Sequence, residues 1–380
     1  MISSDYFDYS AATPLEPRVL AVMVPYFSDK FYNPSAGYLA AQSVKKDLDA
    51  TRQLIAKHFG CKSTELIFTA GGTEANNLAI RGILEQYLNG NIVTSAIEHD
   101  SVLKPSSKFK YKRVKVNSQG YVDEVDLRRK IDDDTVIVSV MYVNNEVGTI
   151  QPIKQIAKLV EEIRRDRKSN KNLTPLYFHT DASQAGNFLS LNVNSLGVDM
   201  MTVNGGKIYG PKQSAVLYLK TGVKLDPIIL GGGQERGYRS GTENVANYVG
   251  LSVAIDLAQT EHKQNTKRME EIREIALKLI TENIPKSTIN GGRNKIPSMI
   301  HLTIPEIDNE TVMMRLDEFG FQVAVGSACK ASNDEPSHVL MAMGFSRQEA
   351  QSTLRISMGK YTTKESVSHL INCLQKACQA

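Results

Sequence analysis

Short apolar runs alternate with longer amphipathic runs along most of the chain. The apolar runs predict strands at Leu66–Thr69, Asn91–Thr94, Thr135–Val143, Leu176–His179, Met200–Val203 and Ala215–Leu219. The amphipathic runs predict helices, among them Ser43–His58, Glu74–Tyr87 and Ile153–Arg167. Apolar strands that alternate with helices are typical of a mostly parallel sheet covered on both faces. We therefore expect an α/β fold.

The last third of the chain has a different pattern. A polar helix around Thr260–Asn283 is expected to lead into a second domain. That domain would contain a strand at Met299–Thr303, a helix at Asn309–Phe319 and a final helix at Lys364–Ala377. The pattern thus predicts a large sheet domain with a smaller domain appended to it.

Composition narrows the class of protein. With 380 residues, of which 41% are hydrophobic, the chain can bury a large core. Its net charge of +4 does not call for a nucleic-acid partner. The first residues lack the basic and apolar regions of a secretory signal, and no apolar run reaches the length of a membrane span. The four cysteines, at positions 61, 329, 373 and 378, form no metal-like pair. We expect a cytoplasmic protein with reduced thiols, no membrane contact and no resident metal.

The most informative chemical feature is a lysine after one predicted strand and an acid after the preceding one. Lys207 follows two glycines, and Asp181 begins the segment Asp-Ala-Ser-Gln184. Pyridoxal 5'-phosphate (PLP) requires such a pair. The lysine amine forms a Schiff base with its aldehyde, and the carboxylate keeps the pyridine nitrogen protonated so that the ring withdraws electrons. A lysine beside glycine is otherwise an ordinary turn residue, so the prediction depends on Asp181.

Two further motifs follow predicted strands, and the carboxyl ends of parallel strands gather ligand sites. Gly72 and Thr73 open a helix, where free backbone N–H groups suit a phosphate; the alternative is a plain strand-to-helix turn. His99 could stack on the pyridine ring and assist proton transfer; the alternative is a structural histidine.

Three more side chains complete the predicted chemistry. Asn145 follows the third strand and could reach the cofactor oxygen or the substrate. Arg355 could bind a carboxylate bidentately, although it could equally form a surface ion pair. Cys329 lies in a small polar segment beside Lys330, where exposure and a nearby positive charge favour a nucleophilic thiolate. The cysteines at 61, 373 and 378 lie in or beside helical patterns and are expected to be inert.

Several motifs, in the same order, resemble those of the cysteine desulfurases. They cover nearly the whole chain: Asn33–Ser35, Phe68–Asn77, Glu98–His99, Asn144–Gly148, Asp181–Gln184, Lys207–Lys212, Gly231–Thr242 and Gly326–Cys329. The long loop from Ser327 to Glu335 is similar to that of the long-loop, IscS/NifS-like branch within the class-V PLP-dependent aminotransferases. That branch supplies sulfur for iron–sulfur cluster assembly and tRNA thiolation.

The resemblance implies a fold and an assembly. The fold is PLP-dependent transferase fold type I, of the aspartate aminotransferase kind, with a mostly parallel seven-stranded sheet. The large PLP-binding domain would be residues 13–258. A smaller α+β domain would comprise residues 1–12 and 259–380 and carry the catalytic cysteine loop, about residues 322–336. A homodimer is implied, with sites near its interface. L-cysteine is the implied substrate, and an iron–sulfur scaffold or a tRNA thiolation enzyme the implied sulfur acceptor.

The resemblance also implies roles for the cofactor site. Lys207 would hold PLP and then move protons, and Asp181 would pair with the ring nitrogen. Gln184 and Asn145 would contact the ring oxygen, and His99 would stack on the ring. The implied phosphate contacts are Gly72, Thr73, Asn204 and, from the other subunit, Thr242.

The implied substrate chemistry involves three residues. Asn33 and Arg355 would hold the cysteine carboxylate. Cys329 would attack the substrate sulfur, leaving a persulfide on its own thiol and releasing alanine. This thiol could also meet an iron–sulfur cluster transiently.

Several positions depart from the family pattern. Asn204 and Gly206 replace a serine and a histidine that usually precede the lysine, and Tyr38 replaces a histidine near the Asn-Pro-Ser segment. Lys330 stands where a small hydroxyl residue is common. Fewer phosphate donors predict weaker PLP retention. The chain also ends soon after its last helix, so docking to an iron–sulfur scaffold through a long C-terminal tail is not expected.

Two rival functions remain open on sequence alone. A selenocysteine lyase or another class-V PLP enzyme would share the cofactor site, although a simple aminotransferase would not need Cys329. A catalytically inactive protein with the PLP fold, binding a true desulfurase, would fit the changes at Asn204 and Gly206. The basic stretch Lys104–Lys115 could contact tRNA, but its alternation favours a solvated edge strand, and we do not expect direct nucleic-acid binding.

Overall fold

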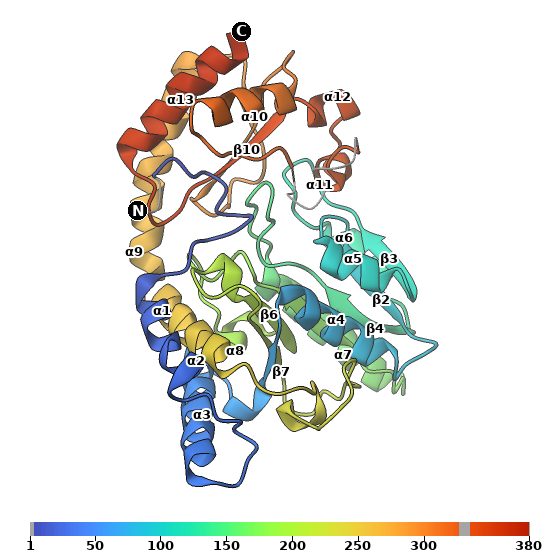
Figure 1. The fold of residues 1–380 in the computed structure, drawn as a ribbon. Helices are drawn as coiled ribbons and strands as arrows, with labels where there is room; N and C mark the ends of the chain where they lie inside the picture. Colours follow the sequence, from blue (N-terminus) through green and yellow to red (C-terminus); the bar gives the residue numbers. More distant parts are fainter. Residues whose placement is uncertain (1–3, 327–334, 380) are drawn as a thin grey trace.

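The computed structural model describes residues 4–326 and 335–379, and these form two sheets with helices around them (Figure 1). The strand order of the larger sheet is β1-β7-β6-β5-β4-β2-β3. Its strands are β1 Leu66–Thr69, β2 Asn91–Ser95, β3 Lys110–Val114, β4 Thr135–Ser139, β5 Tyr177–Asp181, β6 Met200–Asn204 and β7 Ala215–Leu219. β7 pairs antiparallel with β1 and β6, and the other pairs are parallel. The predicted mostly parallel sheet is confirmed.

Alternate residues of each central strand enter different apolar layers. Val138 and Met201 pack in one cluster, whereas their chain neighbours Ile137 and Met200 pack in the other. Successive side chains of a strand point to opposite faces, so both faces of the sheet are buried. The first layer is covered by α3 Leu39–Phe59, α7 Ile153–Ser169 and the first half of α9 Val245–Asn283, and the second by α4 Gly72–Leu84 and α5 Asp100–Ser106.

The second sheet is small and antiparallel, with the order β10-β9-β8. Its strands are β8 Thr288–Ile289, β9 Met299–Thr303 and β10 Thr353–Ser357. Its core joins β9 and β10 to α10 Asn309–Glu318, α13 Lys364–Gln379 and the second half of α9. Phe7, from the other end of the chain, is part of this core.

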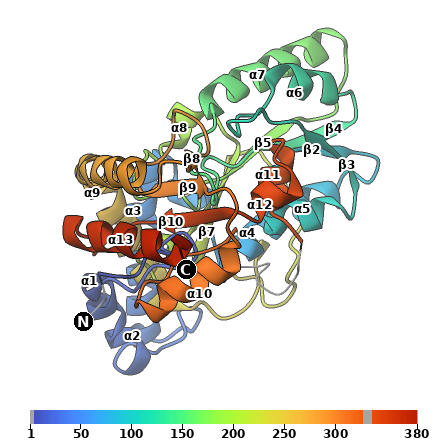
Figure 2. The same cartoon turned by 90° about the horizontal axis from the view of Figure 1, so that it is seen from above.

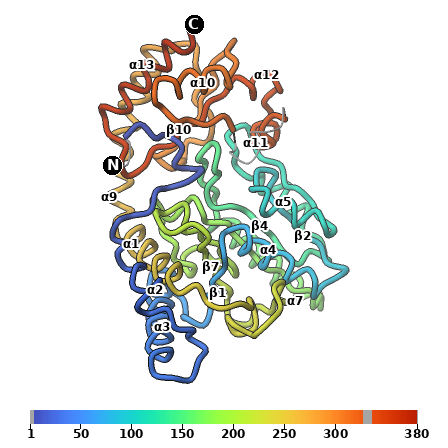
Figure 3. Tube along the Cα trace, viewed as in Figure 1, coloured from blue at the N-terminus to red at the C-terminus, as the bar shows by residue number. Residues whose placement is uncertain are grey.

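The two sheets are connected by α9, whose C-terminal half is the predicted polar helix. Figure 2 shows α9 and α13 beside the small sheet when the molecule is viewed from above, and the trace in Figure 3 follows the N-terminal segment from α1 up to the small sheet. The remaining helices are α1 Pro17–Met23, α2 Pro25–Ser28, α6 Glu124–Lys130, α8 Val193–Leu196, α11 His338–Ala342 and α12 Arg347–Ala350. Among the described residues, none of the helices combines the length and apolar character that a membrane crossing requires.

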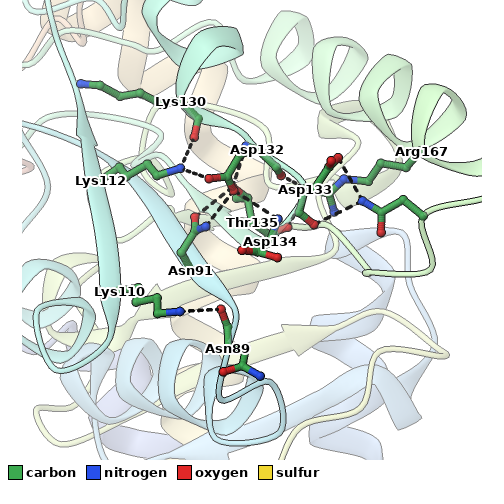
Figure 4. Close-up of polar contacts among 11 residues, drawn as sticks. Asn89, Asn91, Lys110, Lys112, Lys130, Asp132, Asp133, Asp134, Thr135 and Arg167 are labelled. Carbon is green, nitrogen blue, oxygen red and sulfur yellow. Dashed lines mark hydrogen bonds and ion pairs between the residues drawn. The ribbon is translucent and has the colours of Figure 1, made fainter. Parts of the chain in front are cut away.

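The basic stretch Lys104–Lys115 includes the edge strand β3. Lys112 forms an ion pair with Asp132 and donates to the Lys130 carbonyl, and Lys110 donates to the Asn89 carbonyl at 3.5 Å (Figure 4). Lys104 pairs with Asp100 at 2.9 Å. These lysines have acceptors close by, and β3 is the last strand in the order of the larger sheet, so the predicted edge strand is confirmed.

Candidate active site

A cavity of about 680 Å³, open to solvent, lies at the carboxyl ends of the parallel strands. Its lining comes from segments that follow β2, β4, β5 and β6, together with the start of α4, the N-terminal segment and β10. The lining residues are Ser10, Ala11, Gly72, Thr73, His99, Ser101, Met141, Val143, Asn145, Asp181, Ser183, Gln184, Asn204, Lys207 and Arg355.

Most of the predicted site residues therefore meet in one place. Asn33 and Thr242 do not line this cavity. Both are exposed, and the Asn33 side chain accepts the Ser35 N–H at 2.9 Å. Cys329 and its neighbour Lys330 lie outside the described residues.

Lys207 lies at the end of β6, in a short 3₁₀ turn. Its Nζ donates to the carbonyl oxygens of Ser10 at 2.8 Å and Ala11 at 2.5 Å. The Gln184 amide donates to the same Ser10 carbonyl at 2.9 Å. The segment before α1 thus forms one wall of the site, which sequence reasoning missed because a backbone carbonyl is present at every residue and leaves no signal.

Asp181 ends β5, the strand next to β6. Its Oδ2 accepts a hydrogen bond from Asn76 Nδ2 at 2.7 Å, and its Oδ1 accepts the Ser183 N–H at 2.9 Å. The side chain is thereby fixed at the cavity that Lys207 also lines. Asn76 was also missed, although a fully buried amide on the apolar face of α4 is a signal that a polar partner lies opposite.

The first turn of α4 lies beside the Asn204 side chain. A side chain on Gly72 would place its Cβ 3.3 Å from Asn204 Nδ2, so the first turn of α4 and the Asn204 amide are adjacent. Free N–H groups of the helix start and an amide donor suit a phosphate. A Cβ on Gly206 would lie 3.3 Å from Lys212 Cδ, because the Lys212 side chain passes close to that position.

Arg355 lies in β10 and is almost completely buried. Its Nη2 forms an ion pair with Asp8 Oδ1 at 2.7 Å, and its Nη1 donates to the Asn145 carbonyl at 3.1 Å. Within the described residues its Nε has no hydrogen-bond partner. The guanidinium lines the cavity with donor capacity left for a carboxylate.

His99 precedes α5 and is held by its own helix. Its Nδ1 accepts the Ser101 N–H at 3.1 Å. Burial lowers the pKa of His99, as do the positive charges of Lys207 and His338, and the negative charges of Asp181 and Asp100 oppose this. The preceding residue, Glu98, is fully buried, and burial raises its pKa to about 8 although it accepts from Ser95 and Met141.

These groups fit PLP. A lysine and a carboxylate at the ends of neighbouring strands suit its aldehyde and ring nitrogen, the N–H groups at the start of α4 suit its phosphate, and Arg355 suits the carboxylate of an amino-acid substrate.

The comparisons with known proteins agree with this chemistry. Residues 5–370 match the family model described as aminotransferase class-V, and the chain belongs to this family of PLP-dependent enzymes. A cysteine desulfurase IscS of Dictyoglomus turgidum is 37% identical over 98% of this chain and 93% of its own length. A solved NifS-like protein superposes with a TM-score of 0.89 at 32% identity over 98% of both chains. A structure of SspA in complex with cysteine gives a TM-score of 0.82 at 33% identity, over 94% of this chain and all of that one. Within the family, the relatives of this protein are cysteine desulfurases of the IscS and NifS type.

Proposed function

We propose that the protein is a cysteine desulfurase that converts L-cysteine to L-alanine and transfers the sulfur to Cys329. The observation that carries this proposal is that Lys207, Asp181 and Arg355 line one cavity in a chain whose similar relatives are named cysteine desulfurases. When bound, PLP supplies an aldehyde for the Lys207 amine and a ring that withdraws electrons from the substrate.

The residues of the chain divide the remaining work. Arg355 binds the substrate carboxylate, and the Lys207 amine takes and returns a proton at the substrate Cα. Asp181 would pair with the ring nitrogen, Gln184 and Asn145 would contact the ring oxygen, and His99 would stack on the ring. Gly72, Thr73 and Asn204 would hold the phosphate.

The sulfur step belongs to Cys329. Its thiolate attacks the sulfur of the bound cysteine, an S–S bond forms, and the Cβ–S bond breaks. The electron pair of that bond stays on the Cβ side and is protonated, so alanine leaves and a persulfide remains. No outside oxidant is needed, because the two electrons that the sulfur loses stay on the β-carbon, which becomes the methyl group of alanine.

We also propose a homodimer. Several large apolar side chains of residues 20–39 are exposed, namely Leu20, Val24, Phe27, Phe31, Tyr38 and Leu39. Exposed apolar surface is typical of a protein interface where such side chains adjoin one another. Asn33 lies in the same region and Thr242 is exposed, so a second copy could bring these residues to a neighbouring site. The sulfur acceptor is an iron–sulfur scaffold protein or a tRNA thiolation enzyme.

The test follows alanine, sulfide and the mass of the protein during turnover of L-cysteine. Parent enzyme should release alanine and gain one sulfur atom on Cys329. Cys329→Ser should keep the cofactor absorbance and lose sulfur transfer, because a hydroxyl is a poor nucleophile toward sulfur. Lys207→Ala should lose both the borohydride-fixed cofactor and turnover. Sulfide release by Cys329→Ser at the parent rate would show that the mechanism is wrong.

A further inference from the structure

The hydrogen bonds around His99 specify which of its two ring nitrogens carries the proton. Nδ1 accepts the backbone N–H of Ser101 at 3.1 Å. A backbone N–H can only donate. A proton on Nδ1 would therefore face another proton, and Nδ1 must be the unprotonated nitrogen of the neutral ring.

The Ser101 hydroxyl points to the same assignment. Asn76 Nδ2 donates both to Asp181 Oδ2 at 2.7 Å and to Ser101 Oγ at 2.9 Å. The amide must be oriented this way because an ionised carboxylate can only accept. Ser101 Oγ therefore accepts from Asn76, and its own proton is available to His99 Nδ1 at 2.9 Å.

The environment of the ring opposes a second proton. The positive charge of Lys207 and the neighbouring His338 also oppose a positive charge on the ring, whereas the negative charges of Asp181 and Asp100 favour one. The buried Glu98 precedes His99 in the chain. Burial is the strongest influence and lowers the pKa of His99. A ring that stays neutral, with its proton on Nε2, can neither accept a proton at Nε2 nor readily release one.

We propose that His99 works as a hydrogen-bond donor through Nε2, held in the neutral tautomer with an unprotonated Nδ1 by Ser101, and is not a proton carrier. Its contribution is a hydrogen bond to negative charge that develops on a bound ligand. Proton transfers then fall to Lys207. Ser101 is a positioning residue, and its Asn76 contact couples the orientation of His99 to that of Asp181. The inference rests on the proposed function for the identity of the ligand but not for the state of the ring.

Nitrogen NMR of holoenzyme labelled in its histidines tests the tautomer directly. The chain has seven histidines, and the His99 signals are those lost in His99→Gln. We expect an unprotonated Nδ1 and a protonated Nε2 at every pH at and above the ordinary histidine pKa of about 6.5. An imidazolium ring, or a proton on Nδ1, in that range overturns the proposal even if the enzyme desulfurates cysteine. The expected tautomer in an enzyme that does not desulfurate cysteine would instead count against the proposed function.

A matched pair at Ser101 tests what holds the tautomer. Ser101→Ala removes the hydroxyl and keeps the N–H, whereas Ser101→Pro removes both, at the second residue of α5. In Ser101→Pro the imidazolium fraction at a given pH should rise about tenfold, the effect of one lost hydrogen bond. Ser101→Ala should stay nearer to the parent. Parent-like titration of a folded Ser101→Pro would contradict the role of Ser101.

A second pair, at His99 itself, tests the donor role without reference to the Ser101 variants. Gln places an amide N–H near the position of Nε2, whereas Asn keeps a side-chain acceptor for the Ser101 N–H and does not reach as far. Neither side chain can carry a proton. His99→Gln should turn over cysteine about tenfold faster than His99→Asn, with the pH–rate profile of the parent. Equal loss in both variants would mean that the reaction needs a histidine proton, and the proposal would be wrong.

Discussion

Arg355 and Asp8 form a charge pair whose guanidinium is buried before any substrate arrives. The Arg355 side chain is 2% exposed and that of Asp8 19%. A buried cation left without its partner is costly, commonly about 3–5 kcal/mol when the pair is fully buried. Under the proposed role of Arg355, substrate binding would bring a second carboxylate to a guanidinium that already has one.

The Arg355–Asp8 pair predicts that a bound carboxylate ligand can recover stability that is lost when the charge of Asp8 is removed. Asp8→Asn should lower the free energy of unfolding by about 2 kcal/mol, less than the fully buried figure because Asp8 is partly exposed. L-alanine, whose carboxylate can replace the lost charge, should then restore more stability in the variant than it adds to the parent. Denaturant unfolding with and without alanine measures both effects. Equal stabilisation of the two proteins would show that the ligand carboxylate does not meet Arg355.

Gly206 gives a second prediction, concerning retention of the cofactor. Gly206→His would add a possible phosphate donor, and the Lys212 side chain must shift because its Cδ lies 3.3 Å from the new Cβ. One added charge-assisted hydrogen bond should tighten PLP about tenfold, while the parent should lose part of its PLP on dialysis. Gly206→Ala, which adds the Cβ without a donor, is the control. If Gly206→His binds PLP no more tightly than Gly206→Ala, another donor already binds the phosphate.

At the scale of elements, the turn before β4 is fixed by a polar network (Figure 4). Asp132 accepts hydrogen bonds from Lys112, Asn91 and Thr135. From α7, Arg167 donates to the carbonyl oxygens of Asp132 and Thr135. The network ties three strands and a helix together at the end of the sheet opposite the cavity.

Asp132 should make the stability of this end depend on pH. Burial raises its pKa, but the hydrogen bonds from Lys112, Asn91 and Thr135 outweigh that effect and hold the pKa below its usual value. A depressed folded-state pKa contributes stability above the unfolded value of about 3.9, and that contribution is lost as the pH falls further. Asp132→Asn should cost about 1 kcal/mol at neutral pH, because the side chain is half exposed and screened by solvent.

Unfolding free energies measured across the acid range check this prediction. The parent and Asp132→Asn curves should converge as the pH falls below about 4. Asp134→Asn, an exposed change in the same turn, should leave the parent curve nearly unaltered. A constant difference between parent and Asp132→Asn at every pH would show that the carboxylate charge is not responsible.

The strands and the polar residues after them could be predicted because each depends on local pattern. An apolar run followed by Asp181, Asn204 or His99 is visible in the chain, and parallel strands bring such ends together. The run Thr135–Val143 was predicted too long. β4 ends at Ser139, whereas Val140 and Val143 are apolar because they are buried in the following loop.

Long-range pairings could not be predicted in this way. Asp8 and Arg355 lie at opposite ends of the chain, and nothing local in either segment indicates the other. Ser10 and Ala11 act through carbonyl groups that every residue has. Ser101 is an ordinary helix residue until Asn76 and His99 are placed around it. The residue-by-residue cofactor roles remain predictions.

For the whole molecule, the proposed dimer with shared sites predicts complementation between subunits. In such a dimer, Thr242→Val would impair the active site of the partner subunit, to which Thr242 contributes. Lys207→Ala would impair the active site of its own subunit. A mixed dimer would carry both defects in one site and neither in the other. Random pairing makes about half of the dimers mixed, so about a quarter of parent activity should return.

Activity after unfolding and refolding the two variants together measures this complementation. Each variant refolded alone is the control. Activity that only equals the mean of the two controls would mean that Thr242 serves its own subunit, and sedimentation as a monomer would exclude shared sites altogether.

The contact between Lys207 and the carbonyls of Ser10 and Ala11 has a thermodynamic consequence. Under the proposed role of Lys207, the start of the chain and the PLP aldehyde compete for a single amine. Two equilibria that share one group are linked, and each changes the other by the same factor. Any change that strengthens the hydrogen bonds between residues 10 and 11 and the Lys207 ammonium group should weaken PLP binding by the same factor. PLP binding should in turn weaken the contact between the N-terminal segment and the site.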